Sequence, residues 1–382
     1  MKARYQYRVY PTSKQQQSLA QLFGCVRVVF NDALAICKQS ETLPSNGDLQ
    51  KLVITQAKKT AERGWLSEVS NIPLQQSVAD LGVAYKNFFD SLGGRRKGKM
   101  VGRPRFKKKV GRQSARFRIG GFSLKGESVY LAKIGNLQPI WSRELPSEPS
   151  SVTVIKDASN RYFLSFVVEV EPVEVDAKNQ SIGIDLGIKT FAAMSNGEMI
   201  QSPNYSRLDK KLRRKQKKFA RQTVGSNRRE KTRLQAAKLH TKISDTRKDF
   251  LQKLSTRVVR ENQVITLEDL NVSGMVKNRR LSRAISIQGW REFRTLCEAK
   301  AEKYGRTFNI ISRWEPTSQV CSSCGFRWGK LDLKVRTVLC LSCGTEHDRD
   351  LNAAKNINKV GIGHGHDSKW TRIDRKTTSV AS

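Results

Sequence analysis

Acidic residues are scarce in this chain of 382 residues: Asp and Glu total 34, against 71 Lys and Arg, for a formal net charge of +37. Basic side chains stay protonated at physiological pH, so this imbalance excludes a neutral or acidic surface. The length, with 38% hydrophobic residues, is sufficient for several buried cores, and wholesale disorder is not expected. The composition predicts a folded protein whose partner is a polyanion.

Long apolar runs are also missing. We find no stretch near the roughly 20 residues that a membrane-spanning helix requires, and the opening, MKARYQYRVYP, has no apolar signal core. We therefore expect a soluble protein of the prokaryotic cytoplasm or nucleoid, with no membrane partner. No repeat of the solenoid type is present.

A disulfide framework is not expected either, although the chain has seven cysteines. Cys25, Cys37 and Cys297 lie in helix-like apolar patterns. Free cysteine is usually buried, so these three are predicted to be small core side chains.

The other four cysteines form two C-x-x-C pairs separated by fifteen residues, Cys321 with Cys324 and Cys340 with Cys343. This is the spacing of a ribbon-type zinc site, in which each pair presents two thiolates. A redox dithiol is the alternative, but it requires one pair only. Four thiolates leave no open position for water, so the predicted zinc is structural. His347 is expected to hydrogen-bond and not to be a fifth ligand.

The first half of the chain predicts a β module with helices inserted into it. Residues 2–10 alternate like a half-buried strand, and apolar spacing predicts helices over 14–38 and 73–92. Short strands return over 115–170, with a hairpin around 158–160. The opening strand is expected to join these later strands.

Between the two parts, GGRRKGKMVGRPRFKKKVGR (93–112) contains ten Lys or Arg in twenty residues and no acid. This predicts a loop that binds phosphates; a solvated linker is the alternative. The loop residues assigned to nucleic-acid binding are Arg95, Arg96, Lys97, Arg103, Arg105, Lys107, Lys108 and Lys109.

A long helical stretch is predicted over 207–262. Its first part, 207–233, holds thirteen basic residues and two acidic ones. It is predicted to line a nucleic-acid channel, with an ordinary solvated helix face as the alternative. The residues assigned to binding here are Lys210, Lys211, Arg213, Arg214, Lys215, Lys217 and Lys218.

Around this stretch the pattern is that of an α/β region. A strand ends at Asp185, a second strand and an Asn-Gly turn follow, and further strands are predicted over 264–270 and 307–312 with an amphipathic helix over 287–304. The tail from Gly361 is expected to be disordered.

Three acids stand at notable places. Asp185 and Glu268 each end an apolar strand, and Asp350 opens the helix LNAAKNI. Burying three carboxylates together is costly unless a cation compensates them, and oxygen ligands favour Mg²⁺ or Mn²⁺. Taken singly, each acid has an ordinary explanation: Asp348 and Asp350 are candidate helix caps, and Asp269 a surface residue.

Several motifs occur together in a recognisable order. GIDLGIKTFAAMS, LEDL, CSSCG with CLSCG, and HDRDLNAAKNI follow one another, with GRPRFKKK upstream and YRVYP at the start. The series resembles the TnpB family, transposon-encoded RNA-guided nucleases related to the type V CRISPR effectors. The resemblance covers residues 1–360, and no ligand position is lost.

This resemblance implies an α/β multidomain fold: an RNase H-like (RuvC) nuclease domain with an inserted zinc ribbon, and a β-barrel wedge domain carrying an inserted helical recognition domain. The implied boundaries are 1–12 and 113–176 for the wedge, 13–112 for the recognition domain, 177–317 and 347–360 for the nuclease, 318–346 for the ribbon, and 361–382 for the tail.

The resemblance also implies an RNA-guided DNA endonuclease of a transposable element, acting by two-metal phosphodiester hydrolysis. Asp185, Glu268 and Asp350 match the catalytic acids and would bind two Mg²⁺ or Mn²⁺ ions, with Asp348 in support. The implied partners are a guide RNA from the transposon end and double-stranded target DNA, bound by a monomeric protein. A cleavage-silent guided repressor is the first alternative, but it predicts a missing acid. A guide-free resolvase is the second, but it needs no inserted helical segment.

Overall fold

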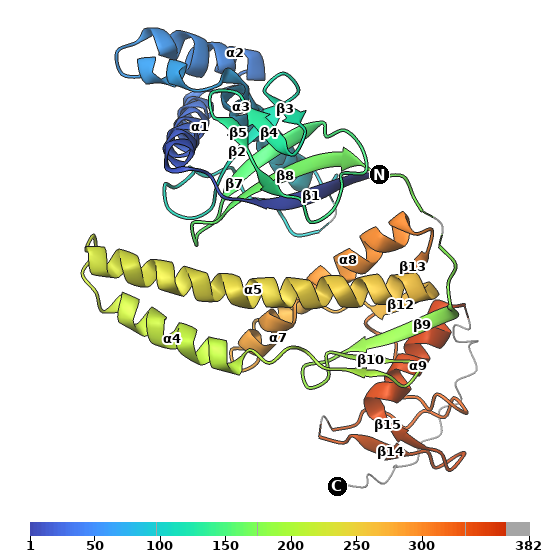
Figure 1. Ribbon diagram of the computed structural model, residues 1–382. Coiled ribbons are helices and arrows are strands. Elements are labelled where there is room, and N and C mark those ends of the chain that lie inside the picture. The colour runs from blue at the N-terminus through green and yellow to red at the C-terminus, as the bar shows by residue number, and fades with distance from the viewer. Residues whose placement is uncertain (97, 174, 333, 364–382) are drawn as a thin grey trace. The chain divides into compact units, whose positions relative to one another are not determined.

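The computed structural model describes residues 1–96, 98–173, 175–332 and 334–363. The chain divides into two compact units (Figure 1). The first comprises Met1–Val170 with Gln222–Lys238, and the second comprises Glu171–Arg221 with the described residues from 239 onward.

An antiparallel five-stranded sheet, in the order β2-β7-β8-β1-β6, forms the centre of the first unit. Its strand β1 pairs with β8 along its whole length, from Lys2 opposite Glu169 to Val9 opposite Tyr162. The opening strand therefore joins the later strands, as predicted. The strands of this unit are β1 (Lys2–Val9), β2 (Gln113–Arg118), β3 (Phe122–Lys125), β4 (Ser128–Leu131), β5 (Gly135–Leu137), β6 (Pro139–Ile140), β7 (Ser151–Lys156) and β8 (Tyr162–Glu169), with β3, β4 and β5 in a separate sheet.

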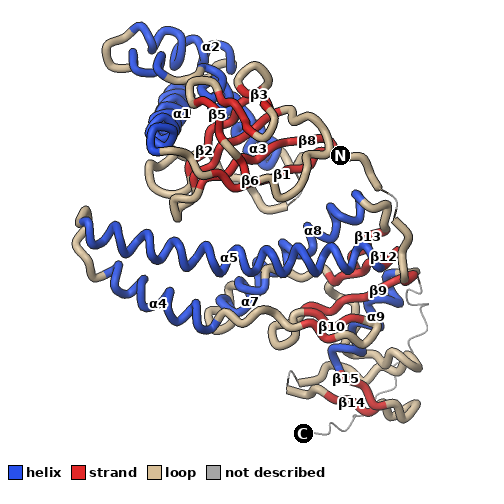
Figure 2. Tube along the Cα trace, viewed as in Figure 1, coloured by secondary structure: helices blue, strands red, loops and turns tan. Residues whose placement is uncertain are grey.

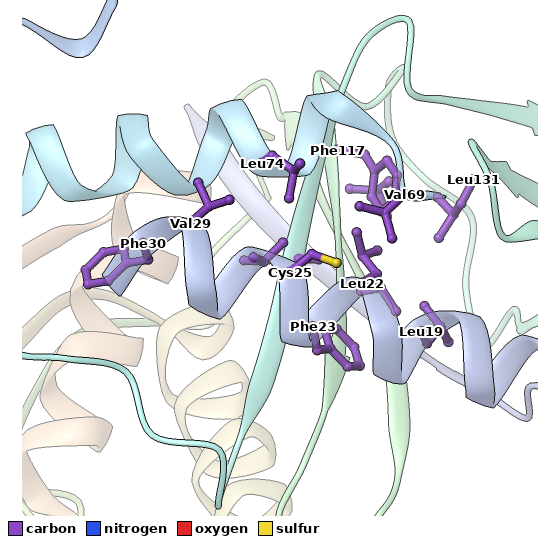
Figure 3. Close-up of a cluster of buried hydrophobic side chains, with 14 of the residues drawn as sticks. Leu19, Leu22, Phe23, Cys25, Val29, Phe30, Val69, Leu74, Phe117 and Leu131 are labelled. Carbon is purple, nitrogen blue, oxygen red and sulfur yellow. The ribbon is translucent and has the colours of Figure 1, made fainter. Parts of the chain in front are cut away.

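Helices occupy the segment between β1 and β2, namely α1 (Ser13–Gln39), α2 (Asn46–Gln50) and α3 (Asn71–Leu92), with short 3-10 and π-helical turns from Lys51 to Glu68. α1 begins at a capping box: the Thr12 hydroxyl accepts from the Gln15 N–H, and the Gln15 side chain accepts from the Thr12 N–H. Side chains of α1 and α3 pack together in the core shown in Figure 3.

α1 corrects one expectation, because its length and apolar composition are sufficient for a membrane span. Half of that apolar window is buried inside the first unit, and Leu19, Val29 and Leu34 have no exposed surface. These contacts are those of a core helix. Cys25 and Cys37 on the same helix are buried, as predicted.

The second unit is built on a mixed five-stranded sheet in the order β11-β10-β9-β12-β13. Strands β9, β12 and β13 run parallel, while β10 and β11 are antiparallel to their neighbours. Their bounds are β9 (Asn179–Leu186), β10 (Ala192–Met194), β11 (Met199–Ile200), β12 (Asn262–Glu268) and β13 (Thr307–Ile311).

Side-chain alternation gives this sheet two different faces. Ile182, Ile184, Ile265 and Leu267 belong to one core cluster with buried residues of α5 and α8, including Cys297. The intervening residues face α9, which packs on β9 and β12 (Figures 1 and 2).

One glycine divides a predicted helix in two, and another sets the start of a second predicted helix. The stretch over 207–262 forms α4 (Ser206–Ala220) and α5 (Asn227–Glu261), separated by a turn in which Gly225 has φ 85°. The helix predicted over 287–304 is present as α8 (Trp290–Lys303), which begins after Gly289, at φ 75°; this glycine separates it from α7 (Ser282–Gln288). A residue in this left-handed conformation ends a helix, and glycine adopts it readily because it has no Cβ.

The remaining elements are α6 (Val272–Met275), the hairpin strands β14 (Thr337–Leu339) and β15 (Glu346–Asp348), and α9 (Arg349–Gly361). The predicted tail starts at Gly361, which is the last residue of α9. Its residues 364–382 lie outside the described residues. The basic loop over 93–112 contains no helix or strand among its described residues, as predicted; Lys97 is not one of them.

Candidate functional site

The four predicted zinc ligands meet at the end of the second unit. Their Sγ atoms all lie within 4.8 Å of one another, with 3.7 Å between Cys321 and Cys343 and 3.5 Å between Cys324 and Cys340. A tetrahedral zinc with Zn–S bonds of about 2.3 Å separates its sulfurs by about 3.8 Å. The donor set and its spacing therefore fit one zinc ion with no open coordination position.

The same local turn presents each pair of thiols. The Gly325 N–H donates to the Cys321 carbonyl (3.0 Å), and the Gly344 N–H donates to the Cys340 carbonyl (2.9 Å). Both glycines have positive φ, 81° and 68°, so a side chain would strain either turn. His347 is buried, and its Nε2 lies 3.0 Å from the Cys321 Sγ, consistent with the expected hydrogen-bonding role.

Two buried asparagines, which the sequence interpretation missed, connect α9 to the first C-x-x-C turn. Asn352 accepts from the Ser322 N–H (2.8 Å) and donates to the Val320 carbonyl (2.7 Å). Asn356, one helical turn later, donates to the carbonyls of Val320 (2.7 Å) and Thr317 (2.8 Å). Asparagines four residues apart on an otherwise apolar helix face were the available signal.

The sheet register brings two of the three acids to one face. Thr266 pairs with Gly183 across β12 and β9, so Glu268 and Asp185 each follow two residues later, on the same face. This face contacts α9, whose first turn contains Asp350. The carboxyl ends of parallel strands and the start of α9 thus bring the three acids together.

Two glycines allow α9 to lie directly on the sheet. A Cβ at Gly183 would overlap the Ala354 carbonyl oxygen and the Asn358 nitrogen, and a Cβ at Gly361 would overlap the Thr266 side chain. Only residues without a side chain permit this approach. The position of Asp350 beside β9 therefore depends on Gly183.

The charges of Asp350 and Glu268 act on Asp185. Burial, followed by the charges of Asp350 and Glu268, raises the pKa of Asp185 to about 7, against the opposing effect of Arg349. Burial also raises the pKa of Glu268, while Arg313 lowers it. The surrounding arginines thus only partly compensate these carboxylates, which favours a bound cation.

The carboxylates are spaced more widely than the thiols. Within the described ranges, the cysteine group alone has three or more ligand atoms all within 4.8 Å of one another.

Asp350 forms an ion pair with Arg336, whose Nη1 lies 3.2 Å from the carboxylate. Arg336 directly precedes β14 of the thiol hairpin. The thiol hairpin and Asp350 are therefore joined by an ion pair as well as by the chain.

Asp348 is the N-terminal cap of α9, because its side chain accepts from the Leu351 N–H (2.8 Å). This bears out the capping explanation for Asp348. The cap fixes the first turn of α9 and thereby the backbone of Asp350.

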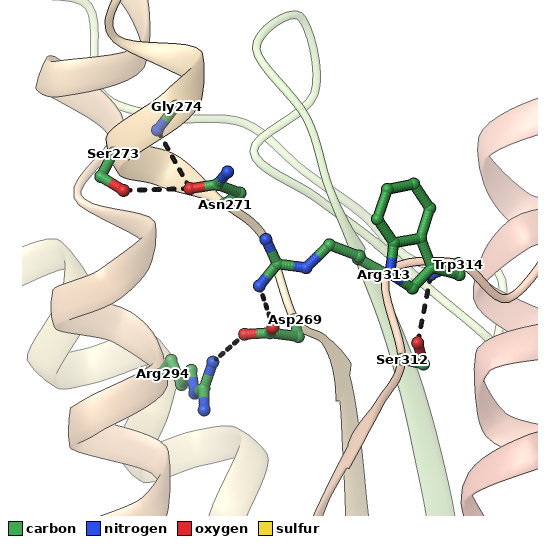
Figure 4. Close-up of polar contacts among 8 residues, drawn as sticks. All are labelled: Asp269, Asn271, Ser273, Gly274, Arg294, Ser312, Arg313 and Trp314. Carbon is green, nitrogen blue, oxygen red and sulfur yellow. Dashed lines mark hydrogen bonds and ion pairs between the residues drawn. The ribbon is translucent and has the colours of Figure 1, made fainter. Parts of the chain in front are cut away.

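Asp269, for which a surface position is one expectation, is part of an ion-pair bridge. Its carboxylate accepts from Arg294 of α8 (2.7 Å) and also from Arg313, just after β13 (Figure 4). Hydrogen bonds from Arg313 and Arg294 lower the pKa of Asp269. The bridge fastens the end of β12, next to Glu268, to two other elements.

The predicted basic residues of α4 are mostly solvent-facing. Leu212 is the buried residue of this helix, and all seven predicted cations except the half-buried Lys215 are exposed. Arg213 pairs with Asp209 at 3.0 Å. A helix so rich in cations, with one buried apolar side chain, is suited to binding a polyanion.

The described cations of the basic loop are exposed as well. Lys107 lies over the Phe30 ring at 4.0 Å and borders a cavity of about 370 Å³ in the first unit. Arg4, Arg112 and Arg116 also line it, and the sequence interpretation missed them. Arg4 and Arg116 reach the cavity from different strands, so only the sheet brings them together.

Family models match three parts of this chain. A family model described as "Probable transposase" matches residues 165–279, one described as "Cas12f1-like, TNB domain" matches 290–357, and one described as "Helix-turn-helix domain" matches 1–40. A curated relative from Streptomyces pristinaespiralis, named "Putative RNA-guided DNA endonuclease", is 40% identical over 95% of this chain and 90% of its own length. The chain belongs to the TnpB family.

More distant members and solved structures extend the comparison. "TnpB-like protein L770" of Acanthamoeba polyphaga mimivirus is 26% identical over 93% of this chain and 72% of its own length. A Cas12f1 structure, solved in complex with sgRNA and target DNA, has a TM-score of 0.56 at 14% identity and covers 94% of this chain and 98% of its own. The mini-RNA-guided endonuclease CRISPR-Cas_phi3 has a TM-score of 0.54 at 10% identity, covering 95% and 92%. The TnpB-family chain therefore has the α/β multidomain fold of these two structures.

Proposed function

We propose that this protein is an RNA-guided, Mg²⁺- or Mn²⁺-dependent DNA endonuclease of a transposable element. The main support is the convergence of Asp185, Glu268 and Asp350 at one end of the sheet. Burial, followed by the charges of Asp350 and Glu268, raises the pKa of Asp185 to about 7. Relatives whose names describe RNA-guided DNA endonucleases support the guide-dependent part.

Asp185, Glu268 and Asp350 would hold two divalent ions, which, when bound, activate a water and stabilise the leaving oxygen in phosphodiester hydrolysis. The protein's own contribution is positional. The β9–β12 register sets Asp185 beside Glu268, while the Asp348 cap and Arg336 fix Asp350. We assign this unit to a RuvC-like domain of RNase H type, consistent with its mixed sheet.

Cys321, Cys324, Cys340 and Cys343 would hold one structural zinc. The buried amides of Asn352 and Asn356 connect this ribbon to α9. Zinc binding would therefore stabilise the helix that presents Asp350, while taking no part in the chemistry.

The basic surfaces would bind the guide RNA and the target DNA. We assign the first unit's sheet to the wedge and its helices to the recognition domain, with the basic loop and α4 contacting phosphates. A formal charge of +37 suits a long guide–target duplex, whose affinity then falls with salt.

The test is cleavage of a duplex matched to the RNA that co-purifies with the protein, in the presence of Mg²⁺. Asp185→Ala is expected to abolish cutting while RNA binding stays close to wild type. Asp249→Ala is the matched control, because Asp249 is an exposed acid of α5 paired with Lys253. Cutting by Asp185→Ala at the wild-type rate would overturn the proposed mechanism.

A further inference from the structure

Trp314 is the most solvent-exposed large hydrophobic side chain in the described part of the molecule, at 86%. By contrast, Trp290 and Trp328 expose 3% and 7%. No ring, cation or hydrogen-bond partner of its indole is found among the described residues, whereas tryptophan is normally largely buried.

The loop that carries this indole starts at the sheet edge where Glu268 lies. Ile311, the last residue of β13, pairs with Glu268 at the end of β12, and Trp314 follows three residues later. Both strands run parallel, so their carboxyl ends share one edge of the sheet. Ligands of open α/β sheets bind at that edge.

The loop that carries Trp314 is held at both ends. Arg313, directly before it, is bound to the Asp269 carboxylate (Figure 4). At the other end, the Thr317 carbonyl accepts from Asn356 of α9 (2.8 Å). Within the loop, the Trp314 N–H donates to the Ser312 hydroxyl (3.3 Å). The exposed ring therefore projects from a fixed backbone.

We propose that Trp314 is a stacking platform for an unpaired nucleobase of the strand that enters the acidic site. This inference rests on the proposed nuclease function and adds a binding residue to the same site. A flat aromatic face accepts any base. Arg313, directly before Trp314, and Arg294 share the single carboxylate of Asp269, which leaves one net positive charge for phosphates. The expected ligand is single-stranded, because pairing and stacking within a duplex cover the base faces.

The experiment is a fluorescence titration of the full-length protein with a short oligothymidine, without added divalent ions. Trp314→Ala is expected to weaken binding by about 5- to 140-fold, the range for loss of one base–aromatic stack, and to remove most of the quenching of indole emission. Trp314→Phe should retain most of the affinity, because a ring remains. Trp65→Phe, a change at another partly exposed tryptophan, is the control and should match wild type.

Two further measurements separate stacking from charge and from folding. An oligonucleotide of abasic sites should bind wild type and Trp314→Ala with equal affinity. On oligothymidine, the fold difference in affinity between the two proteins should persist as salt rises, since salt screens only the phosphate contacts. Thermal unfolding of Trp314→Ala should match wild type. The proposal would be overturned if Trp314→Ala bound oligothymidine as tightly as wild type. It would also be overturned if the variant lost as much affinity for the abasic oligonucleotide as for oligothymidine. Guided cleavage that still requires Asp185 would in that case leave the proposed nuclease function intact.

Discussion

Gly183 of β9 and Asn358 of α9 meet backbone to backbone. A Cβ on Gly183 would overlap the Asn358 nitrogen and the Ala354 carbonyl oxygen. This close approach lets the first turn of α9 place Asp350 near Asp185, and it therefore determines whether the acidic site forms.

Replacing Gly183 with alanine is expected to destabilise the second unit by about 1–3 kcal/mol, because overpacking against backbone atoms cannot be relieved by a side-chain rotation. Denaturant unfolding measures this change. Gly102→Ala is the control, since a Cβ there meets nothing within 4 Å. Equal unfolding midpoints for the two variants would contradict the packing argument.

The pH dependence of stability is expected to report on Asp185. Its pKa in the folded protein is about 7, raised from an ordinary value of 3.8, so the folded state holds the proton more tightly than the unfolded state. The stability from this protonated carboxyl is fully present below pH 3.8 and is lost as pH rises through about 7.

Thermal unfolding of the zinc-loaded protein, without added Mg²⁺ or Mn²⁺, measures this effect. Asp185→Asn should raise the midpoint more above pH 7 than at acidic pH, because asparagine cannot ionise. Mg²⁺ should stabilise wild type more than the variant. A midpoint difference independent of pH would contradict the raised pKa.

Asn352→Ala is expected to loosen the thiol hairpin. It removes the acceptor for the buried Ser322 N–H, and an unsatisfied buried donor costs about 1–3 kcal/mol. Zinc transfer to a chromophoric chelator should be faster than in wild type. Lys355→Ala, at an exposed position of the same helix, should leave this rate unchanged. Wild-type zinc release from Asn352→Ala would show that the amide does not anchor the hairpin.

Charge on α4 should appear in the salt dependence of RNA binding. The double change Lys210→Gln with Lys217→Gln is expected to reduce the slope of log K against log salt by up to about 2, since each phosphate contact contributes about 0.9 on a duplex. Lys253→Gln is the control, because Asp249 neutralises that lysine at 2.8 Å. An unchanged slope in the double variant would exclude both lysines from the interface.

The sequence by itself determined the elements whose signals are local. The C-x-x-C spacing identified four thiols that the structure brings within 4.8 Å. Alternation identified β1, and apolar periodicity identified α1 and α3, because these patterns depend on residues a few positions apart. The interruptions at Gly225 and Gly289 were missed because an isolated glycine is tolerated within a helical pattern, and only the backbone shows its positive φ.

Only the tertiary structure decided which acids belong together and what holds them. The β9–β12 register, the glycine that admits α9, and the bridge from Asp269 to Arg294 and Arg313 join segments far apart in the chain. The raised pKa of Asp185 depends on this assembly, since its main causes are burial and the charges of two carboxylates that are far from Asp185 in the sequence. Both effects depend on distances within the folded chain, and the linear sequence does not contain those distances.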